Sequence, residues 1–214
     1  MKTSPALWLV VVFGTWLIQS PPARAAEAEL LTGNWKHQDI GPVEMKGSAT
    51  VDGGVFTVKG VLETWGTNDG FHYVFQTLKG DGAIVARVTA VENTLAHAKG
   101  GVMIRETLAA GSKHAETVVT ATDGAQFLTR TATDDKTTSA KTGLNKNVFP
   151  YWVKLERKGE TFSSYESTDG KAWTPIGSTN IAMKAEVFIG LRGSSHQKTQ
   201  LGTARFDHVE VTKP

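Results

Sequence analysis

The sequence of 214 residues contains no cysteine. This absence excludes disulfide bonds, thiolate catalysis and zinc sites with cysteine ligands. Long apolar runs are also scarce, because the longest, residues 6–18, is shorter than the roughly 20 residues of a membrane-spanning helix. No window places apolar residues at helical spacing over three turns, and the nearest attempt, residues 92–98, indicates a loop. We therefore expect little helix and no membrane span after the N-terminal segment.

That N-terminal segment has the features of a secretory signal peptide. Lys2 precedes the apolar run, and the stretch "QSPPARA" follows it with small residues at Ala23 and Ala25. We expect cleavage after Ala25 and a secreted or periplasmic protein; a retained N-terminal anchor is the alternative. Cleavage would remove Lys2 and Arg24 and leave 21 basic against 21 acidic residues. Without a basic surplus, nucleic acid is not an expected partner.

The remainder, residues 26–214, is expected to form one all-β domain. Short segments of alternating polarity, rich in β-branched and aromatic residues, are separated by glycine, aspartate and asparagine. Turns such as "VDGGVF" and "STDGKAW" indicate hairpins. The expected strands are 48–51, 55–60, 70–78, 83–91, 101–107, 115–121, 126–131, 151–157, 161–167, 173–179, 185–191 and 203–211.

These strands favour two stacked antiparallel sheets, a jelly-roll sandwich, with a closed barrel as the second choice. Crossover helices are missing, so parallel sheets are not expected. No repeat of 20–50 residues indicates a propeller or a solenoid. The polar stretch 132–146 is expected to be a surface excursion of the same domain.

Side-chain alternation predicts which face of each strand is buried. Phe71, Tyr73 and Phe75 share one face of their strand, which we expect to be the core face, while His72 and Gln76 lie on the other. Three further strands place an arginine opposite their apolar positions; these residues are Arg87, Arg105 and Arg130. If the four strands are neighbours in one sheet, the two polar residues and the three arginines line a single polar surface. Solvated arginines paired with nearby acids are the simpler alternative.

Such a surface could bind a polar ligand. Arginine, histidine and glutamine side chains can hydrogen-bond hydroxyl or carboxylate groups, while an exposed aromatic ring stacks on a sugar. Trp65 and Trp152 are the candidates for that ring, and Trp173 could equally close the core. Around the "NDG" turn, Trp65, Asp69 and His72 are the candidates for recognition.

Motifs for catalysis or metal binding are missing. No pair of acids two residues apart on one strand face provides the two carboxyl groups of a glycosidase. Nucleophile elbows, zinc-binding helices, phosphate loops and EF-hand loops do not occur. Aspartates in the loops "TNDG", "KGDG" and "TDDK" could hold calcium, although turn preference explains them without an ion. We therefore expect no cofactor and no catalytic residue.

Several longer segments resemble a known family. They are "WGTNDGFHYVFQTLKGDGAIVARVTAVEN", "AKGGVMIRETLAAGSKHAETVVT", "PYWVKLERKGETFSSYESTDGKAWTPIGS" and "FDHVEVT". Together they resemble the DUF1349-type domains of the concanavalin A-like lectin/glucanase superfamily, over roughly residues 34–212. The resemblance implies a two-sheet jelly roll in an exported bacterial protein. It supplies no catalytic set, because the Glu-x-Asp-x-x-Glu motif of the glucanases is missing and Gly70 stands where many relatives have an acid.

The sequence therefore favours an exported, non-catalytic module that binds a carbohydrate or a similar polar ligand on an open sheet face. An exported glycan-active hydrolase or lyase of a β-sandwich family is the alternative. A structural or protein-interaction module of the cell envelope is the third possibility. The sequence indicates neither the sugar nor the oligomeric state.

Overall fold

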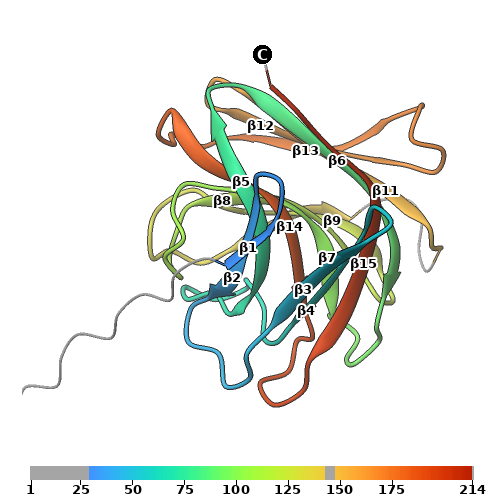
Figure 1. Cartoon of the computed structure of the whole chain (residues 1–214). Coiled ribbons are helices and arrows are strands. Elements are labelled where there is room, and N and C mark those ends of the chain that lie inside the picture. The colour runs from blue at the N-terminus through green and yellow to red at the C-terminus, as the bar shows by residue number, and fades with distance from the viewer. Residues whose placement is uncertain (1–28, 143–147, 214) are drawn as a thin grey trace, which may run out of the picture.

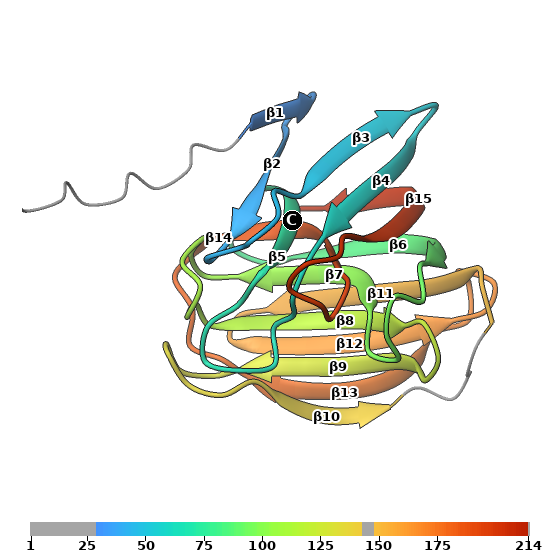
Figure 2. The same ribbon diagram turned by 90° about the horizontal axis from the view of Figure 1, so that it is seen from below.

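The computed structural model describes residues 29–142 and 148–213, which form fifteen β-strands and no helix (Figure 1). The predicted signal peptide lies outside these residues. Within them, no helix is long and apolar enough to cross a membrane. Neighbouring strands pair antiparallel throughout, and the strands form two stacked sheets, as predicted (Figure 2).

The eight-stranded sheet, sheet A, carries the candidate site. In spatial order it contains β1 (Glu29–Thr32), β2 (Trp35–Ile40), β5 (Phe71–Lys79), β14 (Glu186–Ser194), β7 (Lys99–Arg105), β8 (His114–Thr120), β9 (Gly124–Arg130) and β10 (Thr138–Thr142). The seven-stranded sheet B contains β13 (Thr174–Asn180), β12 (Thr161–Ser167), β11 (Tyr151–Lys158), β6 (Gly82–Val91), β15 (Gly202–Thr212), β4 (Val55–Gly60) and β3 (Ser48–Asp52).

Apolar side chains from the facing sides of both sheets form the main core. Sheet A contributes Val102 and Ile104, and sheet B contributes Ile84, Ala86 and Val88, all fully buried. The predicted two-residue alternation is confirmed for these strands, because apolar side chains point inward at every second position.

Strand β5 faces the other way from its prediction. Val74 and Leu78 pack into the main core, whereas Phe71, Tyr73 and Phe75 lie in a second apolar cluster. Successive side chains of a strand point to opposite faces, so these three aromatic rings lie on the outer face of sheet A. They are buried there, as packing residues were expected to be, but against Ile40 and Met103 of the same sheet and Leu108 of the β7–β8 loop instead of against sheet B.

Loops cover much of the outer face of sheet A, and all residues of β7 and β8 are buried. The segment 61–70 after β4 crosses this face and is hydrogen-bonded to the β7–β8 loop through Asp69 N and Ala110 O at 3.1 Å. Polar side chains on this outer face are therefore enclosed between the sheet and its loops, and they form the candidate site.

Candidate functional site

The predicted common surface does not include Arg87. Arg87 lies on β6 of sheet B, whereas the other two predicted arginines lie on sheet A. Its guanidinium donates two hydrogen bonds to Asp207, at 2.7 and 2.6 Å. Trp152 lies beside it, with the Arg87 guanidinium carbon 5.8 Å from the ring centroid. These two candidates therefore occupy the outer face of sheet B, away from the rest.

His72 and Gln76 lie on the inner side of β5, opposite the two arginines of sheet A. His72 is buried and its Nδ1 is 2.7 Å from Oδ1 of Asp39. Gln76 borders a separate hollow with Lys36 and Lys213. The prediction of one surface therefore fails for both residues, because even and odd positions of one strand face opposite sides of the sheet.

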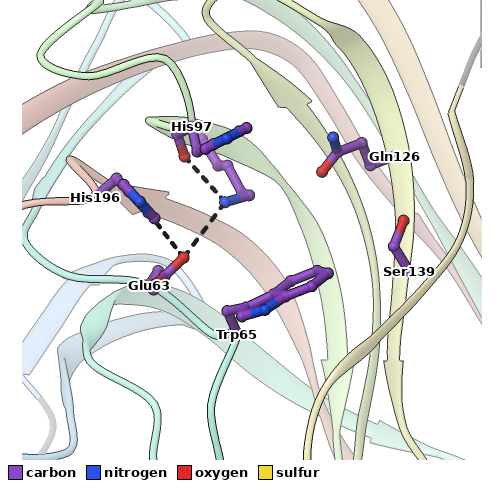
Figure 3. Close-up of a pocket in the computed structure, with 7 residues that line it drawn as sticks. Glu63, Trp65, His97, Gln126, Ser139 and His196 are labelled. Carbon is purple, nitrogen blue, oxygen red and sulfur yellow. Dashed lines mark hydrogen bonds and ion pairs between the residues drawn. The ribbon is translucent and has the colours of Figure 1, made fainter.

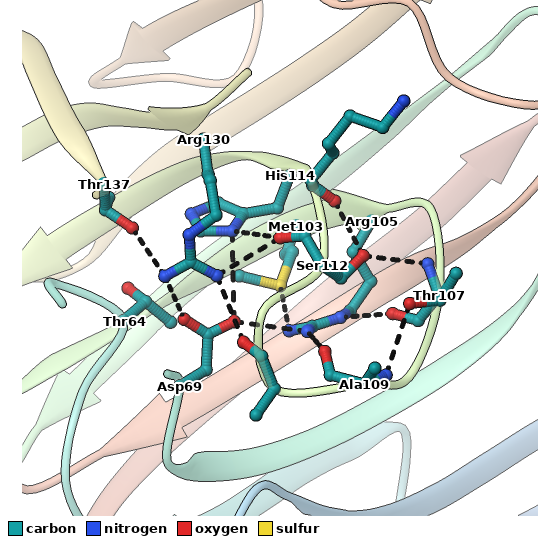
Figure 4. Close-up of polar contacts among 12 residues, drawn as sticks. Thr64, Asp69, Met103, Arg105, Thr107, Ala109, Ser112, His114, Arg130 and Thr137 are labelled. Atoms are coloured by element: carbon teal, nitrogen blue, oxygen red, sulfur yellow. Dashed lines mark hydrogen bonds and ion pairs between the residues drawn. The ribbon is translucent and has the colours of Figure 1, made fainter. Parts of the chain in front are cut away.

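Arg105, Arg130 and Asp69 do come together, but in a buried cluster (Figure 4). Arg130 donates to Oδ1 of Asp69 at 2.6 Å, and Arg105 Nη2 is 3.2 Å from Oδ2. Burial raises the pKa of Asp69, although both guanidinium groups oppose this shift. Neither arginine is exposed to solvent, because the loops that follow β4, β7 and β9 close over them.

These two arginines fasten the loops to the sheet. Arg130 donates to the carbonyl oxygens of Gly66 at 2.6 Å, Asp135 at 2.7 Å and Ala110 at 3.1 Å. Arg105 donates to the carbonyl oxygen of Thr107 at 2.7 Å. A guanidinium provides five donors in a rigid plane, which suits it to satisfy several buried carbonyls at once. The cluster therefore supports the neighbouring site and is itself closed to ligands.

A second buried contact holds the segment 61–70 nearer its start. Thr64 donates a hydrogen bond to Oε1 of Glu116 on β8. The other carboxylate oxygen is 3.3 Å from Nε of Arg192 on β14, whose guanidinium carbon lies 5.0 Å from the Phe71 ring centroid. Thr64 and Asp69 thus hold both ends of the short stretch that carries Trp65.

Beside this stretch, the outer face of sheet A has an open cleft of about 340 Å³ (Figure 3). It is lined by Glu63, Trp65, His97, Lys99, Gln126, Ser139 and His196. Trp65 is 49% exposed, and its ring lies between the Glu63 side of the cleft and the Gln126 side. The volume is in the range of pockets that hold small ligands.

The polar groups of the cleft interact around Glu63. Oε2 of Glu63 is 2.8 Å from Nδ1 of His196 and 3.7 Å from Nζ of Lys99. Nδ1 of His196 makes no hydrogen bond within the described residues, although it lies this close to the carboxylate. Lys99 is only 4% exposed and donates to the carbonyl oxygen of His97 at 3.0 Å. Burial, reinforced by Arg192, lowers the pKa of Lys99.

The wall that carries Glu63 has an unusual backbone. Leu62 and His196 both have left-handed conformations, with φ of 55° and 60°. Their segments are joined by hydrogen bonds from Leu62 N to Gln197 O at 2.8 Å and from His196 N to Leu62 O at 2.9 Å. Non-glycine residues in this region are strained, and such strain concentrates at functional sites.

Of the predicted ligand-binding residues, Trp65 alone lines this cleft, and Asp69, Arg105 and Arg130 support it from below. The other lining residues were missed by the sequence analysis, because they come from separate segments and form no motif. For the described part of the chain, no three histidine, aspartate or glutamate side chains are grouped to hold a metal ion. The expectation of no cofactor, with calcium in the loops as the less favoured alternative, remains a prediction.

The fold and the cleft together define a concanavalin A-like β-sandwich with a ligand-sized hollow on the outer face of one sheet. The family model described as "Protein of unknown function (DUF1349)" matches residues 59–214, so the chain belongs to this family. The resemblance inferred from the sequence is thereby confirmed. No curated protein matches the sequence.

Solved structures share the fold at low sequence identity. The carbohydrate-binding module CBM66 from Bacillus subtilis has a TM-score of 0.56 and 16% identity, with 84% of this chain and 96% of that chain covered. A functionally unknown protein from Saccharomyces cerevisiae has a TM-score of 0.63 and 15% identity, with 83% and 96% covered. The GH43 protein BlXynB (K247S) from Bacillus licheniformis has a TM-score of 0.65 and 11% identity; 88% of this chain matches 38% of that protein.

Proposed function

We propose that this protein is an exported, non-catalytic carbohydrate-binding module and that it binds its ligand in the cleft beside Trp65. The observation that carries the proposal is the half-exposed Trp65 ring, placed between polar groups on two sides of one hollow. An exposed aromatic face packs against the apolar face of a sugar ring, while polar groups around it hydrogen-bond the hydroxyl groups. The fold shared with CBM66 agrees with this proposal.

Binding is favoured over glycoside hydrolysis by the carboxylates of the cleft. Glycosidases generally use two carboxyl groups on either side of the scissile bond. Glu63 is the one carboxylate among the described residues that line the hollow. Asp69 and Glu116 lie nearby but are buried and engaged with arginines.

The proposal is tested by the retention of purified protein on soluble xylan, mannan, arabinan and β-glucan in affinity electrophoresis. Trp65→Ala is expected to weaken retention about tenfold, because the loss of a stacked ring costs on the order of 1 kcal/mol or more. Trp152→Ala is the matched control, since it removes a partly exposed tryptophan from the outer face of sheet B. If Trp65→Ala is retained as well as wild type, this cleft is not the binding site.

A further inference from the structure

We propose, resting on the proposed function, that the unit bound in the cleft is an uncharged sugar whose adjacent hydroxyl groups are bound jointly by Glu63 and Lys99. The carboxylate and the ammonium face each other at 3.7 Å in the wall next to Trp65. The ring of the sugar would pack on the indole while two neighbouring hydroxyl groups reach this pair.

The formal charges that line the cleft are balanced. Glu63 and Lys99 are the acid and the base among the lining residues, beside two histidines, and their formal charges cancel. Behind them, Arg192 is matched in the same way by Glu116 at 3.3 Å. An anionic ligand would have to approach the Glu63 carboxylate, and a cationic ligand would have to approach the Lys99 ammonium. Like charges brought together in this way oppose binding and select against both kinds of ligand.

The pair of Glu63 and Lys99 retains unused hydrogen-bonding capacity. An ammonium group has three donors, and that of Lys99 makes one hydrogen bond within the described residues, to the His97 carbonyl oxygen at 3.0 Å. Its separation from Glu63 is too long for a hydrogen bond. A hydroxyl group both donates and accepts, so adjacent hydroxyl groups can satisfy both partners together. A carboxylate on the ligand would only accept hydrogen bonds, and an ammonium on the ligand would only donate them. Neither charged group can therefore satisfy Glu63 and Lys99 together.

The pair is held in place before a ligand arrives. His196 lies 2.8 Å from the Glu63 carboxylate, and the hydrogen bonds between residues 62 and 196–197 join the two segments. Thr64, next to Glu63 in the chain, is anchored on Glu116. Burial, reinforced by Arg192, lowers the pKa of Lys99, and the nearby carboxylate of Glu63 opposes this shift. A preorganised pair loses little entropy on binding and discriminates by charge more sharply.

The test compares methyl glycosides in pairs that share their ring stereochemistry and differ in one substituent, which is neutral in one member and charged in the other. Dissociation constants are measured by calorimetry on the full-length protein. The pairs are glucoside with glucuronide, galactoside with galacturonide, and N-acetylglucosaminide with glucosaminide. We expect a neutral member to bind about tenfold or more tightly than its charged mate. A charged member that binds as well as its neutral mate overturns this inference and leaves carbohydrate binding intact. If no member binds although a polysaccharide is retained, this inference is overturned and the proposed function stands; if no polysaccharide is retained either, both are overturned.

Two variants test whether the pair itself sets this preference. Glu63→Gln removes the negative charge at nearly constant shape, so binding of uronides should improve relative to neutral glycosides. Lys99→Gln should improve the binding of glucosaminide in the same relative sense. Glu186→Gln, an exposed position on β14, is the control and should leave the ratios unchanged. A merely structural role of Glu63 would lower all affinities together, so unchanged ratios in Glu63→Gln would also overturn the inference.

Discussion

Replacing Arg130 with methionine is expected to destabilise the protein far more than the same replacement at Arg87. Arg130 has no exposed surface, and it donates hydrogen bonds to Asp69, Thr137 and four backbone carbonyl oxygens. Methionine fills part of the volume but leaves the Asp69 carboxylate buried without its nearest partner. Removing one member of a buried ion pair costs about 3–5 kcal/mol.

Arg87 is the matched control because its ion pair with Asp207 lies near the surface, where 31% of the Arg87 side chain is exposed. Pairs of this kind contribute on the order of 1 kcal/mol or less, since solvent screens them. In thermal unfolding, the difference should appear as a decrease for Arg130→Met of on the order of 10 °C relative to wild type. Arg87→Met should unfold within a few degrees of wild type.

Urea denaturation, followed by tryptophan fluorescence and circular dichroism, measures both free energies of unfolding. The double variant with Asp69→Asn adds a sharper test, because removing the orphaned charge should recover part of the stability lost in Arg130→Met. A stabilising role of the buried Arg130–Asp69 pair is refuted if Arg130→Met loses no more stability than Arg87→Met. It is also refuted if Asp69→Asn adds its full cost to that of Arg130→Met, since the two residues would then be independent.

Three further outcomes are expected. Hydrogen bonds from Arg87 lower the pKa of Asp207 from 3.8 to about 2, so the pair stabilises the fold above about pH 4. This contribution to the free energy of unfolding, about 1 kcal/mol, should disappear as the pH falls from about 4 to about 2. Arg87→Met lacks the pair, so its free energy of unfolding should not show this decrease. Because the pKa of Lys99 lies below 10.5, glycan affinity should decline as alkaline pH removes its proton; a constant affinity up to 10.5 would contradict this. A Cβ atom at Gly190 would lie 1.9 Å from a backbone oxygen, so Gly190→Ala should cost about 1–3 kcal/mol in urea denaturation. Gly66→Ala, whose nearest neighbour is 4.0 Å away, should not show that loss.

Three strands were missed by the sequence analysis for a common reason. The strands β1, β2 and β10 lie at or near an edge of sheet A, and β10 falls within the polar stretch that was expected to be a surface excursion. Strands near an edge are only partly covered, so their residues need not alternate between apolar and polar. Their pairing is decided by the strand beside them, as that of Lys36–Ile40 is by β5.

The orientation of β5 shows a second limit of reasoning from alternation. Six of its nine residues are buried, because both faces of the strand are covered. Periodicity then separates Phe71 and Tyr73 from Val74, but it does not tell which set faces sheet B. The orientation depends on the loops, because they cover the outer face of sheet A and exclude solvent from it as sheet B does from the inner face.

The sequence by itself determined the class of fold, twelve of the fifteen strands and the alternation along most of them, because these depend on residues that are neighbours in the chain. Tertiary structure alone decided that Arg87 lies on one sheet and Arg130 on the other, and that Arg130 is buried. It also assembled the cleft, where Glu63, Lys99 and His196 meet from three separate segments. Local periodicity reports which side of a strand is apolar; which strands become neighbours, and which loops close over them, depends on contacts between residues far apart in the chain.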